Sequence, residues 1–200
     1  MEERKNRRER YSDGFALTKY TLPVVWQMAD VIPGGFFIYK ENENRDLIYA
    51  NKKVLEIYGC DTLDEFKELT GYTFEGMVYP EDFPEIQASI DRQIDDDEGD
   101  SLDYVVYRIK RKDGTIRWVD DYGHYSYSPE YGDVYYVFIS DITERKEMED
   151  EEKRFDSARK HLKSLEGNIA EAISHIGNNE QTEEDLKNLM ARIDEVNSEI

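Results

Sequence analysis

The sequence predicts an α+β fold: one five-stranded antiparallel sheet with short helices on one face, followed by a helical C-terminal segment. Strand-like runs fall into two groups, two runs before residue 50 and three after residue 100. Short helical stretches separate the two groups. Residues 144–200 contain no proline, tyrosine or tryptophan, and their pattern is typical of helix throughout.

Strands are expected in five stretches of alternating or continuous apolar residues: 36–39, 47–49, 102–112, 115–127 and 134–140. The third and fourth stretches flank Asp113-Gly114, a strong hairpin turn. Helices are expected between the two groups of strands at 51–58, 62–69 and 74–79, and from Pro80, which suits a first-turn position, to Asp95. These helices must cover one face of the sheet, which leaves an interior between the layers where a small molecule could bind.

Residues 1–33 are expected to be helical, because apolar residues recur there at three-to-four-residue spacing. These residues are Leu17, Tyr20, Val24, Val25, Met28 and Val31. Pro23 should kink or interrupt this helix, and Pro33-Gly34-Gly35 should end it. The expected organisation is therefore an N-terminal helical segment (1–33), a sheet domain (34–143) and a helical segment (144–200).

The chain of 200 residues carries a net charge of −20, so its surface should repel nucleic acid and anionic lipid heads. The first ten residues are an exception and are basic. No apolar run is long enough to span a bilayer, and no signal-peptide core follows Met1. A soluble, cytoplasmic protein without a nucleic-acid partner is expected. The lone Cys60 excludes an internal disulfide and a multi-cysteine zinc site.

No catalytic residue and no enzyme activity are predicted. The sequence has no glycine-rich phosphate loop, no Gly-x-Ser-x-Gly elbow and no His-x-x-x-His pair. The acidic run 95–100 is similar to a calcium loop in composition only, because its glycine comes too early and no bidentate glutamate follows. No metal site is therefore predicted.

Several segments in the right order resemble the PAS family across about residues 28–146. They are Leu47-Ile48-Tyr49-Ala50-Asn51, Leu55 to Gly59, Val78-Tyr79-Pro80-Glu81-Asp82, Tyr107 to Gly114 with Arg117-Trp118-Val119, and Asp141 to Lys146. The last two are similar to the central hairpin of domains with a PAC-type ending and to its junction with a signalling helix. The resemblance implies the spatial strand order 2-1-5-4-3 and a role in sensing or dimerisation.

A PAS-like interior implies a ligand pocket, and alternation along the strands selects the residues expected to line it. The candidates are Ile38, Tyr58, Phe74, Met77, Val105, Tyr107, Ile109 and Trp118. Flavin-binding LOV-type relatives carry a reactive cysteine after the short helices, and residues 72–79 here contain none. Haem-binding relatives carry a histidine on the long helix, and residues 80–97 contain none. No cofactor is assigned, and noncovalent flavin stays open.

The junction after the last strand is expected to fix where the sheet stops and the next helix starts. Asp141 can accept hydrogen bonds from the first free amides of that helix, and Thr143 is an alternative cap. Glu144 lies three residues after Asp141, the spacing of a capping box. A distortion of the sheet should then move the helix, although an ordinary cap without a signalling role stays open.

Apolar residues in the C-terminal segment follow a heptad pattern that predicts a helix–helix interface in a homodimer. The expected interface residues are Met148, Phe155, Leu162, Leu165, Ile169 and Ile176. Gly177-Asn178-Asn179 should end the first helix, and a second helix should start at Thr182, giving a helical hairpin.

The predicted function is a sensory or regulatory module that binds a small molecule or partner and signals through its C-terminal helix. An effector protein or domain would receive the signal. The alternative is a histidine-kinase-type phosphotransfer fragment, with His161 or His175 as phosphoacceptor. Neither histidine is followed by the acidic residue and proline of that family's motif, which makes this alternative the weaker hypothesis.

Overall fold

The computed structural model describes residues 17–96 and 102–175, together with residues 184, 187, 188 and 190–192. The chain divides into two compact units, Met1–Thr143 and Glu144–Ile200. The acidic run predicted as a loop lies in part outside the described residues, as do Ile176, the Gly177 helix stop and the predicted start of a second helix at Thr182.

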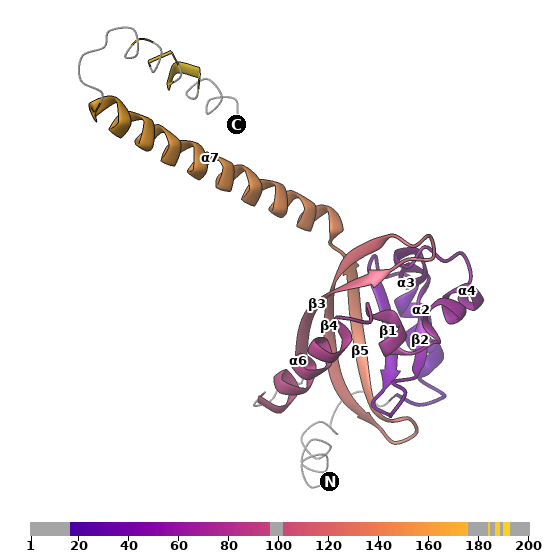
Figure 1. Ribbon diagram of the computed structural model, residues 1–200. Coiled ribbons are helices and arrows are strands. Elements are labelled where there is room, and N and C mark those ends of the chain that lie inside the picture. Colours follow the sequence, from indigo (N-terminus) through magenta and orange to yellow (C-terminus); the bar gives the residue numbers. More distant parts are fainter. Residues whose placement is uncertain (1–16, 97–101, 176–183, 185–186, 189, 193–200) are drawn as a thin grey trace. The chain divides into compact units, whose positions relative to one another are not determined.

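The first unit is built on a five-stranded antiparallel sheet in the order β2-β1-β5-β4-β3 (Figure 1). Its strands are β1 (Gly35–Lys40), β2 (Leu47–Ala50), β3 (Leu102–Lys110), β4 (Ile116–Ser128) and β5 (Gly132–Asp141). The predicted order is confirmed, with the last strand at the centre of the sheet. β3 is an edge strand, and α6 lies beside it (Figure 1).

Four helices lie between β2 and β3 in the chain: α3 (Lys52–Ile57), α4 (Leu63–Thr70), α5 (Phe74–Met77) and α6 (Phe83–Asp96). The first three begin at side-chain caps, because Asn51, Thr62 and Thr73 each accept a hydrogen bond from a backbone amide three residues later. The long helix was expected to start near Pro80 and starts at Phe83, so Pro80 does not occupy its first turn as predicted. Pro84 occupies the first turn of α6, while Tyr79 and Asp82 bind the backbone of Arg108 at the sheet edge.

Each face of the sheet has its own apolar core. The helices α3 to α6 pack on the inner face, where Phe37, Tyr39, Tyr107 and Val119 are fully buried or nearly so. A smaller core forms on the other face around Leu17, Phe36, Ile38 and Val134, with residues of α2 (Leu22–Ala29).

From residue 17 onward, where the structure describes the chain, the N-terminal segment is helical over a shorter stretch than the sequence suggested. Pro23 does not kink α2 but lies in its first turn, where a missing backbone N–H costs nothing. The helix ends at Ala29, before the Pro33-Gly34-Gly35 stop. Val24, Met28 and Val31 of the predicted apolar stripe are exposed, and Leu22 and Ala29 are buried instead.

The second unit contains α7 (Thr143–His175) except for its first residue, Thr143, which belongs to the first unit. One residue, Ile142, separates the helix from the end of β5. This single helix of 33 residues confirms the helical character predicted for this part of the chain. None of the helices in the described residues combines the length and apolarity that a membrane span requires.

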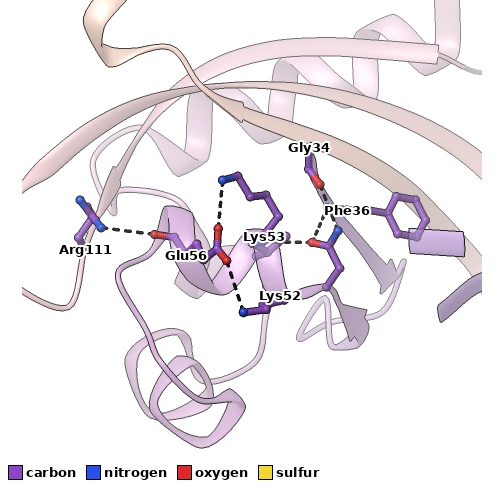
Figure 2. A network of polar contacts seen from close by, with 8 residues as sticks. Gly34, Phe36, Lys52, Lys53, Glu56 and Arg111 are labelled. Atoms are coloured by element: carbon purple, nitrogen blue, oxygen red, sulfur yellow. Dashed lines mark hydrogen bonds and ion pairs between the residues drawn. The ribbon is translucent and has the colours of Figure 1, made fainter. Parts of the chain in front are cut away.

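Asn51 joins the start of β1 to the start of α3. Its Oδ1 accepts hydrogen bonds from the backbone N–H groups of Phe36 (3.0 Å) and Val54 (3.1 Å). Its Nδ2 donates to the carbonyl oxygens of Ala29 (2.9 Å) and Gly34 (3.1 Å). Figure 2 shows these contacts at Gly34 and Phe36, beside the ion pairs of Glu56 with Lys52 and Lys53.

We expect Asn51→Ala to lower the free energy of unfolding by about 3–5 kcal/mol, because it removes four hydrogen bonds and leaves buried backbone groups unpaired. Urea denaturation measures the loss. Asn44→Ala, at an exposed position in the β1–β2 turn, is the matched control and should change stability little. Equal stabilities of the two variants would contradict the role given to Asn51.

Candidate functional site

The inner face of the sheet holds a continuous row of aromatic rings. Tyr135 on β5 stacks on Tyr39 of β1 with ring centroids 4.8 Å apart, and Tyr39 stacks on Phe74 of α5 at 4.7 Å. Tyr107 on β3 meets Phe74 edge-on at 6.1 Å. Stacked and edge-on arrangements are favourable for aromatic pairs, so this row stabilises the packing of α5 on the sheet.

Two buried carboxyl groups lie beside this row, from β3 and β4. The Tyr107 hydroxyl donates to Oδ2 of Asp121 at 2.8 Å. Asp103 lies on the same face, because it pairs with Gly123, two residues beyond Asp121. Oδ2 of Asp103 is buried and has no hydrogen-bond partner among the described residues. A Cβ on Gly123 would come within 2.3 Å of that oxygen, so any side chain there would displace the Asp103 carboxyl from this position.

Burial shifts the titration of these groups strongly. Desolvation raises the pKa of Asp103 from its usual value to about 7. Burial, and secondarily the nearby charge of Asp103, raises the pKa of Asp121 well above its usual range. The pKa of Tyr107 is also raised, first by burial and then by Asp121. The inner face therefore favours protonated carboxyls that can donate hydrogen bonds.

The structure brings together most of the predicted pocket residues. Six candidates pack in one buried cluster on the inner face, each at most 4% exposed: Tyr58, Phe74, Met77, Val105, Tyr107 and Ile109. Within this cluster, Tyr58 donates its hydroxyl to the carbonyl of Met77 at 2.9 Å, and Tyr107 meets Phe74 edge-on.

Two candidates do not belong to this cluster. Ile38 packs in the smaller core on the opposite face, because β1 alternates Phe37 and Tyr39 inward and Phe36 and Ile38 outward. Trp118 pairs with Arg108 on the outer face of β3 and β4 and is half-buried there. Trp118 therefore does not join the inner-face residues with which it was expected to line a pocket.

Asp103 and Asp121 are the interior polar residues that sequence reasoning missed. Asp103 is in phase with Val105, Tyr107 and Ile109, so the alternation of this strand already assigned it to the inner face. Cys60 is buried and has a pKa raised by burial. Within the described residues, no group of three or more His, Cys, Asp or Glu side chains could hold a metal ion.

The junction between β5 and α7 is held by hydrogen bonds to β4. Asp141 Oδ1 accepts from the backbone N–H of Thr143 at 2.9 Å, which satisfies a free amide at the helix start. Thr143 does not act as a cap; its hydroxyl accepts from the backbone N–H of Trp118 at 2.9 Å and lies 3.4 Å from the Trp118 carbonyl. The N–H of Ile142 also donates to that carbonyl, at 2.9 Å. Glu144 lies exposed in the first turn.

Comparison with known proteins identifies the sheet unit. Residues 47–138 match the family model described as the PAS fold. The chain carries a PAS domain. A comparison with curated protein sequences gives no match.

Two solved structures share the PAS fold with this chain. The LOV protein of Rhodobacter sphaeroides is similar with a TM-score of 0.52 and 14% identity, over 88% of this chain and 93% of that one. An RNA-binding Light-Oxygen-Voltage receptor is similar with a TM-score of 0.52 and 16% identity, over 72% of this chain and 40% of the receptor. The PAS fold is that of a signal-sensing module, and no enzyme family is indicated.

The buried carboxyl of Asp103 should make the stability of the PAS domain depend on pH. Its folded pKa of about 7 exceeds the usual unfolded value, so the folded state retains a proton that the unfolded chain releases. Stability should therefore fall as the pH rises from about 4 to about 7. Asp103→Asn should weaken this dependence and stabilise the domain near pH 8 by on the order of 2–4 kcal/mol.

Urea denaturation across this pH range measures the effect. Glu68→Gln, at an exposed position on α4, is the matched control and should leave the pH dependence unchanged. A variant of Asp103 that retains the full dependence would show that another group is responsible.

Thr143→Val should weaken the junction of the PAS domain, because the similar side chain cannot accept the hydrogen bond from Trp118. We expect a loss of about 1–3 kcal/mol in stability and faster amide exchange at Trp118. Ser140→Ala, an exposed change three residues earlier, provides the control. Unchanged exchange at Trp118 would mean that the hydroxyl contact does not hold the junction.

Proposed function

We propose that this chain is a PAS sensory or regulatory module that binds a small molecule or partner and transmits the signal through α7 as a homodimer. The observation that carries the proposal is the apolar stripe of α7. Met148, Phe155 and Leu165 are 65%, 54% and 45% exposed, although they recur at the spacing of a coiled-coil seam.

Exposure of this stripe in a single chain favours a partner helix. Leu162 and Ile169, the other described members of the seam, are half-buried, and Ile176 lies outside the described residues. Each large apolar side chain covered by a partner would contribute on the order of 1.5–3 kcal/mol. The same seam on a second copy supplies matching residues, which makes a homodimer the simplest partner.

Hydrogen bonds at the junction supply a route for the signal. Trp118 on β4 binds Thr143, the first residue of α7, through its backbone N–H. A shift of β4 would therefore move Thr143, the residue at which α7 starts. Trp118 is close in sequence to Val119 and Asp121, which face the inner cluster, so β4 links that cluster to the junction.

The protein proposed here is cytoplasmic and has no nucleic-acid partner, and the charge of the chain supports the second point. A net charge of −20 opposes binding to phosphate backbones, in contrast to what the name of the RNA-binding receptor implies for that protein. The partner that receives the signal is then a protein or a domain attached to α7.

Replacing Leu162 and Leu165 together with glutamate should dissociate the homodimer or unfold the helical part, because two charges would enter an apolar seam. The PAS domain should stay folded. Light scattering measures the mass, and circular dichroism measures the helix content.

Ser157→Glu with Ser164→Glu adds the same two charges to exposed positions of α7 outside the seam, and should keep both mass and helicity. If the leucine variant keeps the mass and the helicity of the unmodified chain, the stripe holds neither a dimer nor a hairpin, and the proposed transmission fails.

A further inference from the structure

The outer edge of β3 faces α6 and exposes a row of backbone groups. In an antiparallel strand, alternate residues direct both N–H and C=O away from the neighbouring strand. Hydrogen bonds of Tyr104 and Arg108 to groups outside the sheet show that the even-numbered residues of β3 are the outward ones. Val106, between them, therefore also directs its N–H and C=O toward α6.

Both neighbours of Val106 are occupied. The side-chain amide of Gln93 binds Tyr104 at two points: Oε1 accepts from the Tyr104 N–H at 2.9 Å, and Nε2 donates to the Tyr104 carbonyl at 3.0 Å. The Arg108 N–H donates to Asp82 Oδ2 at 3.0 Å, and the Arg108 carbonyl accepts from the Tyr79 N–H at 2.8 Å.

The backbone N–H and C=O of Val106 have no such partner among the described residues. They border a groove of about 510 Å³ between α6 and the sheet edge. Ser89 and Arg92 line it from the helix, and Tyr104, Val106, Arg108 and Trp118 line it from the sheet. The outward N–H and C=O of Val106 thus lie at a groove. The corresponding groups of Tyr104, two residues earlier, are bound by the side-chain carboxamide of Gln93.

We propose that this groove is a binding site for a small molecule with a planar primary carboxamide on an aromatic ring. The carboxamide pairs with Val106 as Gln93 pairs with Tyr104: its oxygen accepts from the Val106 N–H, and its NH₂ donates to the Val106 carbonyl. A carboxylate cannot do this, because it has no proton for that carbonyl. Tyr104 and Trp118 provide surfaces for the ring.

The occupied neighbours decide the size of the ligand. A peptide adding to a strand edge pairs with several successive outward residues. Gln93 and Asp82 already hold the outward residues on both sides of Val106, so a single amide fits and an added strand does not. Ile86 and Val105 of the inner cluster also line this groove, but the Val106 backbone groups lie at the sheet edge, and the test does not depend on signalling through α7.

Nicotinamide is a suitable probe, titrated into the full ¹⁵N-labelled chain while backbone amide shifts are followed by NMR. We expect a saturable shift of the Val106 amide, with smaller shifts along α6 near Ser89. N,N-dimethylnicotinamide and nicotinate, which lack the donor, should bind at least about tenfold more weakly, the size of one lost hydrogen bond.

Ser89→Tyr should fill the groove and abolish the nicotinamide shift. Ala88→Tyr, at the exposed neighbouring position, should retain it. N-acetylglutamine methylamide, which represents a glutamine side chain of a protein partner, should bind more weakly than nicotinamide. Tighter binding of the glutamine probe, equal binding of the dimethyl analogue, or no shift at Val106 would each overturn the assignment.

Discussion

Asn51 uses every hydrogen-bonding position of its side-chain amide to join three segments of the chain. Its oxygen accepts two backbone N–H groups, from the start of β1 and the first turn of α3, and its nitrogen donates to carbonyls at the end of α2 and before β1. An aspartate could accept but could not donate, and a glutamine would be one methylene too long. Because α2 contributes to the core on one face of the sheet and α3 to the core on the other, this one residue fixes both layers to the same strand.

The inner face combines strong apolar packing with costly polar burial. The stacked rings of Tyr135, Tyr39 and Phe74 hold β5, β1 and α5 together, whereas Asp103 and Asp121 place two carboxyls in the same low-dielectric region. Such groups lower stability unless they are paired or protonated. Their burial therefore costs stability, and it gives the interior a chemical property, namely two carboxyl groups with raised pKa values. The half of the sheet formed by β3 and β4 carries this property, and β4 is also the strand that binds the first residue of α7.

Much of the architecture followed from local patterns in the sequence. Alternation located β3, β4 and β5, and the order of the strands followed from the PAS resemblance. Local patterns failed where two environments look alike in sequence. β1 is buried on both faces from Gly35 to Tyr39, so no polar residue marks the side to which Ile38 belongs. A carboxylate such as Asp103 is typical of a solvent-facing position, so its residue type argued against the inner face to which the alternation of β3 assigns it. The heptads of α7 show which side of the helix is apolar, but the sequence of the helix does not say what packs against that side.

The central position of β5 has a consequence for how this protein is made. β5 pairs with β1 on one side and β4 on the other, so the two hairpins of the sheet have no direct contact through hydrogen bonds until residues 132–141 are present. During synthesis on the ribosome, most of the domain is therefore made while its strand edges still lack hydrogen-bond partners and its apolar side chains are still uncovered. Long-range pairings of this kind are slow to form and exposed to misassembly. The last strand of the sheet is synthesised immediately before α7, so the proposed assembly through α7 can begin only on a domain whose final strand is already available.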